Sequence, residues 1–128
     1  MPHPPEVLAM ILCDQVITDV HTNKKSLIGL FDQVETASLP CVLHELHVYV
    51  SLTDGHGRLP LVLTCIVGDG GDELFRGDSE VEFCDPLQVV ELQFIFPNAR
   101  FPRAAEYRFQ LSALGQVLRE RKFFVGYL

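Results

Sequence analysis

The chain has 128 residues, of which 48% are hydrophobic and 21% are charged. This composition is typical of a globular protein and excludes a disordered chain, and the length predicts one domain over residues 1–128. The formal net charge of −7 at pH 7 disfavours binding to nucleic acid or to an anionic membrane, so we expect neither as a partner.

The first predicted strand covers residues 6–18 and begins with an unbroken apolar run from Val7 to Cys13. The run is too short to span a bilayer, which takes about 20 residues. It also has no Lys or Arg before it, as a secretory signal would. We therefore expect a cytoplasmic protein whose cysteines stay reduced.

Alternating apolar and polar residues predict seven more strands along the chain. In ELHVYVSLT (45–53), for example, Leu46, Val48 and Val50 share one face. Turn residues such as Asp54-Gly55, Asp69-Gly70-Gly71-Asp72 and Leu114-Gly115 separate the strands. The seven strands are expected at about 26–34, 44–53, 59–67, 73–83, 88–96, 105–114 and 117–125.

This pattern predicts an all-β fold, an immunoglobulin-like antiparallel β-sandwich of seven to nine strands with Greek-key connections. The longest joints, 35–43 and 97–104, contain prolines and are expected to cross between the two sheets. Tyr107 opens a late strand just after a proline-containing loop. It fits either a tyrosine corner, whose hydroxyl bonds to upstream backbone, or a half-buried strand end.

Two segments of the chain are ILCDQVITDVHTNKKSLIGLFDQV (11–34) and FPRAAEYRFQLSALGQVLRERKFFV (101–125). They resemble an uncharacterised family of short bacterial proteins, defined only as a domain of unknown function. The shared pattern is a Cys-Asp pair after an apolar strand, a Ser-Leu-Ile-Gly strand ending in Phe, and a late Tyr-x-Phe strand with a Gly hairpin. The resemblance extends over nearly the whole chain. It implies an immunoglobulin-like sandwich, but no activity and no site residue.

The residues predict no catalytic site and no cofactor, so we expect a protein that is not an enzyme. Cys13 is followed by Asp14, whose negative charge raises a thiol pKa, so a buried structural thiol is favoured over a nucleophile. The spacing Cys41-x2-His44-x2-His47 imitates a zinc site. However, strand positions three apart face opposite sides of a sheet.

Calcium is the alternative that strand parity suggests. In an antiparallel sandwich alternate joints lie at the same end, which would group Asp19, Asp54 and Asp85. Three carboxylates fall short of the six to eight oxygen ligands that calcium takes, unless carbonyls and water complete the set. The competing interpretation is that these aspartates only form turns. A calcium-dependent binding module is therefore the second functional hypothesis.

The leading hypothesis is a non-catalytic interaction or structural module. The first two predicted strands are apolar on both faces, whereas a sandwich covers only one face of each sheet. The uncovered face predicts a homo-oligomer or one protein partner. Its expected contact residues are Leu8, Met10, Leu12, Ile28 and Leu30. The alternative is that the first strand switches sheets midway, so that each half buries a different face.

Overall fold

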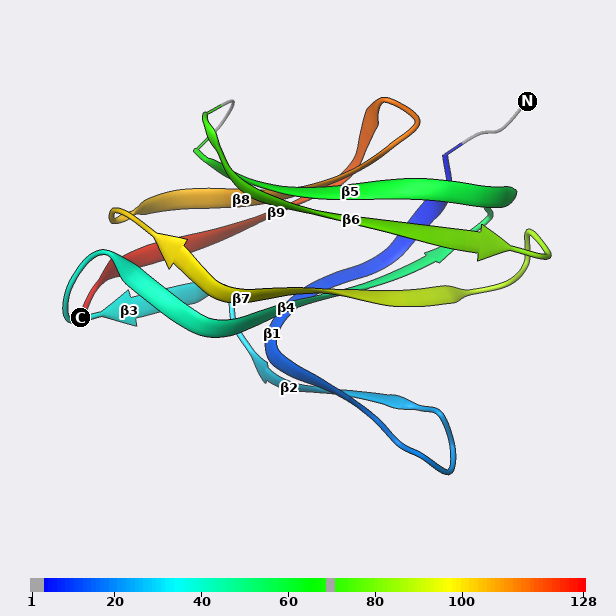
Figure 1. Cartoon of the computed structure of the whole chain (residues 1–128), viewed down its shortest axis with the longest axis horizontal. Coiled ribbons are helices and arrows are strands. Elements are labelled where there is room, and N and C mark those ends of the chain that lie inside the picture. The colour runs from blue at the N-terminus through cyan, green and yellow to red at the C-terminus, as the bar shows by residue number, and fades with distance from the viewer. Residues whose placement is uncertain (1–3, 69–70) are drawn as a thin grey trace.

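The computed structural model describes residues 4–68 and 71–128, which form nine β-strands in two facing sheets (Figure 1). The first sheet has the order β2-β1-β4-β7, made of β1 (Glu6–Thr18), β2 (Lys25–Leu30), β4 (Cys41–Thr53) and β7 (Val90–Phe101). The second sheet has the order β3-β9-β8-β5-β6, made of β3 (Gln33–Thr36), β5 (Gly57–Val67), β6 (Glu73–Phe83), β8 (Ala105–Ala113) and β9 (Gln116–Tyr127). The expected all-β sandwich is confirmed.

The strand expected at 26–34 is two strands in different sheets. β2 pairs with β1 in the first sheet, and β3 pairs in parallel with β9 in the second. The chain crosses from the first sheet to the second within two residues. Phe31 N donates to Leu12 O in β1, whereas Asp32 O accepts from Phe124 N in β9. The switch therefore occurs in this segment, whereas β1 remains in the first sheet.

Gly29 meets two requirements just before this crossing. Its φ is 74°, a left-handed conformation that favours glycine. A Cβ atom there would also lie only 2.3 Å from Asp14 Oδ2. The glycine of the Ser-Leu-Ile-Gly segment thus lets β2 turn toward the second sheet beside Asp14.

The core lies between the sheets and is rich in aromatic side chains. Phe101, Tyr107, Phe109 and Phe123 are all fully buried. Phe109 and Phe123 lie stacked, with ring centroids 5.4 Å apart, and Tyr107 meets Phe101 edge-on at 5.1 Å. Each such pair adds about 0.5–1.5 kcal/mol beyond the burial of its area.

Both long joints expected from the sequence are partly strand. β4 begins already at Cys41 and β7 continues to Phe101, so the later crossing is confined to 102–104. The buried positions of β7 change parity on the way, from Phe94 and Phe96 to Ala99 and Phe101. Asn98 lies at this change with a φ of 53°, a backbone conformation that turns the following side chains over. For this reason, the regular alternation of buried and exposed residues in β7 ends at Phe96.

The structure decides between the two interpretations of Tyr107 and confirms one predicted hairpin. Tyr107 Oη donates to the carbonyl of Arg103 over 2.6 Å, which is the bond expected of a tyrosine corner. The β8–β9 hairpin closes through Leu114 and Gly115, whose φ values of 53° and 76° suit a two-residue type I′ turn. The expected turn over Asp69–Asp72 lies partly outside the described residues.

Candidate functional site

The outer half of the β1–β2 hairpin forms a two-stranded arm, which we define as residues 14–18 and 25–30. β4 pairs with β1 from Glu6 to Cys13, and β2 pairs with β1 from Cys13 to Thr18. Among the described residues, the arm segment of β1 therefore has one strand neighbour only. Figure 1 shows the hairpin extending away from the two packed sheets.

Both faces of the arm carry apolar side chains. Residues paired across the two strands point to the same side, so Ile17, Ile28 and Leu30 share the outer face. Ile28 is 45% exposed and Leu30 is 63% exposed. On the opposite face, Val16 and Leu27 are half-buried. The arm thus presents apolar surface on two sides.

The structure divides the five contact residues expected from the sequence. Leu8, Ile28 and Leu30 are exposed, as a contact surface requires. Met10 and Leu12 are only 3% and 0% exposed and belong to the core, so the expectation for these two is wrong. Their face of β1 is turned toward the second sheet. Leu8 escapes burial because the β1–β4 register shifts between Val7 and Ala9, which leaves Leu8 unpaired at a bulge.

A recess lies beside Leu30, with a volume of about 390 Å³. Ile11, Leu30 and Phe31 supply its apolar wall, and Asp32 and Arg121 supply opposite charges. The Arg121 guanidinium is fixed because its Nη1 donates to the Met10 carbonyl over 2.8 Å. The recess is therefore a preformed hollow at the base of the arm, between β1 and the β2–β3 crossing.

Polar contacts link β4 and β7 on the same outer face of the first sheet. Tyr49 Oη donates to Glu91, and His47 lies between Gln93 and Glu45, with Nδ1 3.4 Å from Gln93 Oε1 and Nε2 3.1 Å from Glu45 Oε1. Burial foremost, and then the Glu91 carboxylate, raises the pKa of Tyr49 to about 12. These polar side chains lie on β4 and β7, so this half of the face is polar while the arm half is apolar.

Cys13 and His47 are cross-strand partners on this face, a proximity that the linear sequence does not reveal. Cys13 is fully buried, and burial is the largest cause that raises the pKa of its thiol. The backbone of Gln15 opposes the increase, and the charge of Asp14 adds to it. A reactive cysteine needs the opposite shift, toward a stable thiolate. The geometry therefore supports a structural role for Cys13.

The three calcium candidates occupy turns. Asp19 Oδ1 accepts from the backbone of His21 and Thr22, and these two bonds lower the pKa of the Asp19 carboxyl. Asp85 Oδ1 similarly accepts from Leu87 N. Asp54 N donates to Pro86 O, so the Asp54 and Asp85 turns, two of the three that strand parity grouped, are neighbours. Within residues 4–68 and 71–128, however, no three Asp, Glu, His or Cys side chains are grouped to hold a metal ion.

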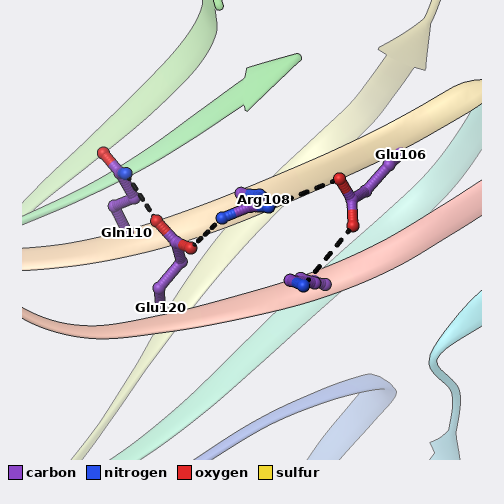
Figure 2. A network of polar contacts seen from close by, with 5 residues as sticks. Glu106, Arg108, Gln110 and Glu120 are labelled. Atoms are coloured by element: carbon purple, nitrogen blue, oxygen red, sulfur yellow. Dashed lines mark hydrogen bonds and ion pairs between the residues drawn. The ribbon is translucent and has the colours of Figure 1, made fainter. Parts of the chain in front are cut away.

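The outer face of the second sheet carries an ionic network on β8 and β9 (Figure 2). Arg108 lies between Glu106 and Glu120, Gln110 donates to Glu120 over 2.7 Å, and Lys122 lies 3.9 Å from Glu106. The Gln110 amide, and next the Arg108 guanidinium, lower the pKa of Glu120. The charges of Arg108 and Lys122 are thus neutralised within the sheet itself.

The comparisons with known proteins identify a family but no activity. Within residues 4–68 and 71–128, no helix is long and apolar enough to cross a membrane. No curated protein matches the chain. Residues 8–126 match the model of a family of unknown function, DUF6941. Since the match covers almost the whole sequence and both segments that carried the resemblance, the chain belongs to the DUF6941 family.

Proposed function

We propose that this chain is a non-catalytic interaction module that forms a homodimer through its β1–β2 arm. The observation that carries the proposal is the exposure of apolar side chains on an arm that only two strands build. An isolated two-stranded hairpin is marginally stable in water. A partner that covers the arm would remove its apolar side chains from water and stabilise it.

The outer face of the arm is a surface on which a second copy of the chain can approach without charge repulsion. With a net charge of −7, two copies repel each other over most approach directions. The outer face of the arm is an exception, because its residues are all uncharged: Gln15, Ile17, Ser26, Ile28 and Leu30. A two-fold axis would place two such faces together, which is the symmetry that most homodimers use.

The recess beside Leu30 supplies a place for an anchor side chain. Its Ile11 and Phe31 walls lie next to the arm, and it is large enough to receive an aliphatic side chain from a partner. Buried anchors in preformed hollows contribute most of the binding energy in protein interfaces. We therefore expect Leu30 and Ile28 to contribute most to association, with Leu8 at the margin.

The test is the solution mass of the native protein and of Ile28→Glu, measured by light scattering over a range of concentrations. Val117→Glu is the matched control, because Val117 is 51% exposed on β9 and gains the same charge away from the arm. A native mass near twice 14.4 kDa, reduced to one chain by Ile28→Glu alone, supports the proposal. Circular dichroism of the variant must still show native strands.

A native protein that stays at the mass of one chain at all concentrations contradicts self-association. A dimer that Ile28→Glu leaves intact contradicts the placement of the interface on the arm. The same measurements are repeated in millimolar calcium. A solution mass or a melting temperature that rises would favour the second hypothesis, a calcium-dependent binding module that uses Asp19, Asp54 and Asp85.

We also infer that the sandwich is of the immunoglobulin-like type and that the protein works in the cytoplasm. The adjacency of β4 and β7 in one sheet and the order β9-β8-β5 in the other match the B–E and G-F-C arrangements of that fold. The tyrosine corner at the start of β8 supports the same assignment. All four cysteines carry free thiols, the usual state in a reducing compartment.

A further inference from the structure

A second hollow lies on the other side of the molecule, at the open seam of the sandwich. β6 and β7 are the edge strands of their sheets, and they lie next to each other (Figure 1). Between them a groove of about 420 Å³ opens, which falls within the range of small-molecule sites, about 300–1,000 Å³. The groove shares no lining residue with the arm or with the recess beside Leu30.

Aromatic rings that continue into the core form the apolar part of the groove. Phe75 and Phe96 line it with ring centroids 4.8 Å apart, and Phe75 also contacts the rings of Phe101 and Phe109 at 6.0 Å. Because Phe101 and Phe109 are fully buried, this surface is held in place by the core. An apolar ligand would therefore meet a preformed surface.

The wall of the groove is unsuited to an added peptide strand. Pro97 and Pro102 line it, and neither can donate a backbone hydrogen bond. Asn98, between them, has a φ of 53° and interrupts the regular strand. Prolines and irregular backbone are features that block pairing at a sheet edge. These residues favour a compact ligand over an extended polypeptide.

Among the described residues that line the groove, Arg100 is the one that carries a charge. It is exposed, and no carboxylate within the described residues forms an ion pair with it. Glu73, which precedes the lining residue Leu74, is paired with Arg76 instead, 3.5 Å away. In a chain of net charge −7, a cation without a partner beside an apolar surface favours a ligand that is both apolar and anionic.

We propose that this groove binds an amphipathic monocarboxylate, with its carbon chain on Phe75 and Phe96 and its carboxylate at Arg100. Guanidinium and carboxylate form paired, charge-assisted hydrogen bonds, which fix the orientation of the ligand. The aromatic surface provides affinity through burial of the chain. This site is independent of the proposed dimerisation through the arm.

The experiment is a titration of the full chain with octanoate, followed by calorimetry and by amide chemical shifts in NMR. Arg100→Gln is compared with Arg103→Gln, an exposed control three residues away that loses the same charge outside the groove. We expect saturable binding with shifts at Leu74, Phe75 and residues 96–102. We also expect about tenfold weaker binding in Arg100→Gln and no change in Arg103→Gln.

Two further ligands test the chemistry of the site. Hexanoate should bind up to about fifteenfold more weakly than octanoate, because two methylene groups fewer are buried. Octanol has the same chain without the charge. It should bind the native protein more weakly than octanoate does, and its affinity should be the same for Arg100→Gln as for the native protein. Ile28→Glu on the arm should leave all these affinities unchanged.

Three results would overturn the proposal. They are octanoate that fails to saturate, equal affinities in Arg100→Gln and Arg103→Gln, or chemical shifts confined to the arm. If octanoate does not bind and Arg100→Gln instead changes the solution mass, the groove contacts a second copy of the chain rather than a carboxylate.

Discussion

Arg121 of β9 donates a hydrogen bond from Nη1 to the backbone carbonyl of Met10 in β1, over 2.8 Å. Arg119 Nη2 makes the equivalent bond to the carbonyl of Val7, over 2.7 Å. Residues 6–12 of β1 pair with β4 on one side, whereas β2 starts to pair only at Cys13. The two guanidinium groups therefore satisfy carbonyls on an open edge of the first sheet and tie it to the second.

Replacing Arg121 should destabilise the protein through this edge. Arg121→Met keeps an unbranched, flexible side chain but leaves the Met10 carbonyl without its donor, so we expect the free energy of unfolding to fall by about 1–2 kcal/mol. Urea denaturation at a fixed protein concentration measures the change. Arg103→Met is the control, because no hydrogen bond or ion pair of the Arg103 side chain exists within the described residues. Equal stabilities of the two variants would show that the bond contributes nothing.

The tyrosine corner should make a separate contribution to stability. Tyr107 is fully buried, and its hydroxyl both donates to Arg103 O and accepts from Arg103 N, at 2.6 and 3.3 Å. Tyr107→Phe should lower the free energy of unfolding by about 1–2 kcal/mol, since it leaves two backbone groups with one partner fewer. Tyr127→Phe, at an exposed position, should leave the melting temperature unchanged. A Tyr107→Phe variant as stable as the native protein would mean that water replaces the hydroxyl fully.

Tyr49 should make stability depend on pH in the alkaline range. Burial and Glu91 raise its pKa from the ordinary value of 10 to about 12 in the native state, and this disfavours the phenolate. The stabilisation is fully present below pH 10 and is lost as pH rises toward 12, because the unfolded chain ionises first. Absorbance titration of the native protein, with Tyr49→Phe subtracted, measures this pKa directly.

Glu91→Gln separates the two causes. It removes the carboxylate and leaves Tyr49 buried, so the pKa of Tyr49 should fall only part of the way toward 10. A pKa that returns fully to 10 would show that Glu91, rather than burial, is the dominant cause. A pKa that stays at 12 would show that the contact with Glu91 has no effect.

Thiol labelling should distinguish Cys84 from the other three cysteines. Cys84 is exposed, whereas Cys13, Cys41 and Cys65 are buried, and burial raises the pKa of Cys65 to about 12. We expect one thiol per native chain to react quickly with Ellman's reagent, and all four to react after denaturation. Cys84→Ser should abolish the fast reaction. Rapid labelling of Cys13 in that variant would contradict the structural role inferred for this thiol.

Patterns in the sequence located most strands and the β8–β9 turn, and they offered the tyrosine corner as one of two interpretations of Tyr107. Alternation with period two depends on the local backbone alone, and turn glycines depend on their own φ values. Membership of the family followed from the same local segments, 11–34 and 101–125. The doubly apolar character of the first two strands was also visible, and it led to the proposal of association.

Only the tertiary structure decided which of those apolar side chains remain exposed. The bulge beside Leu8, the change of sheet at Phe31 and Asp32, and the left-handed residue Asn98 each alter the side to which later side chains point. Met10 and Leu12 consequently lie in the core, while Ile28 and Leu30 stay on the arm. The groove at Arg100 likewise lies between β6 and β7. These consecutive strands belong to different sheets, and their edges come together because the two sheets face each other.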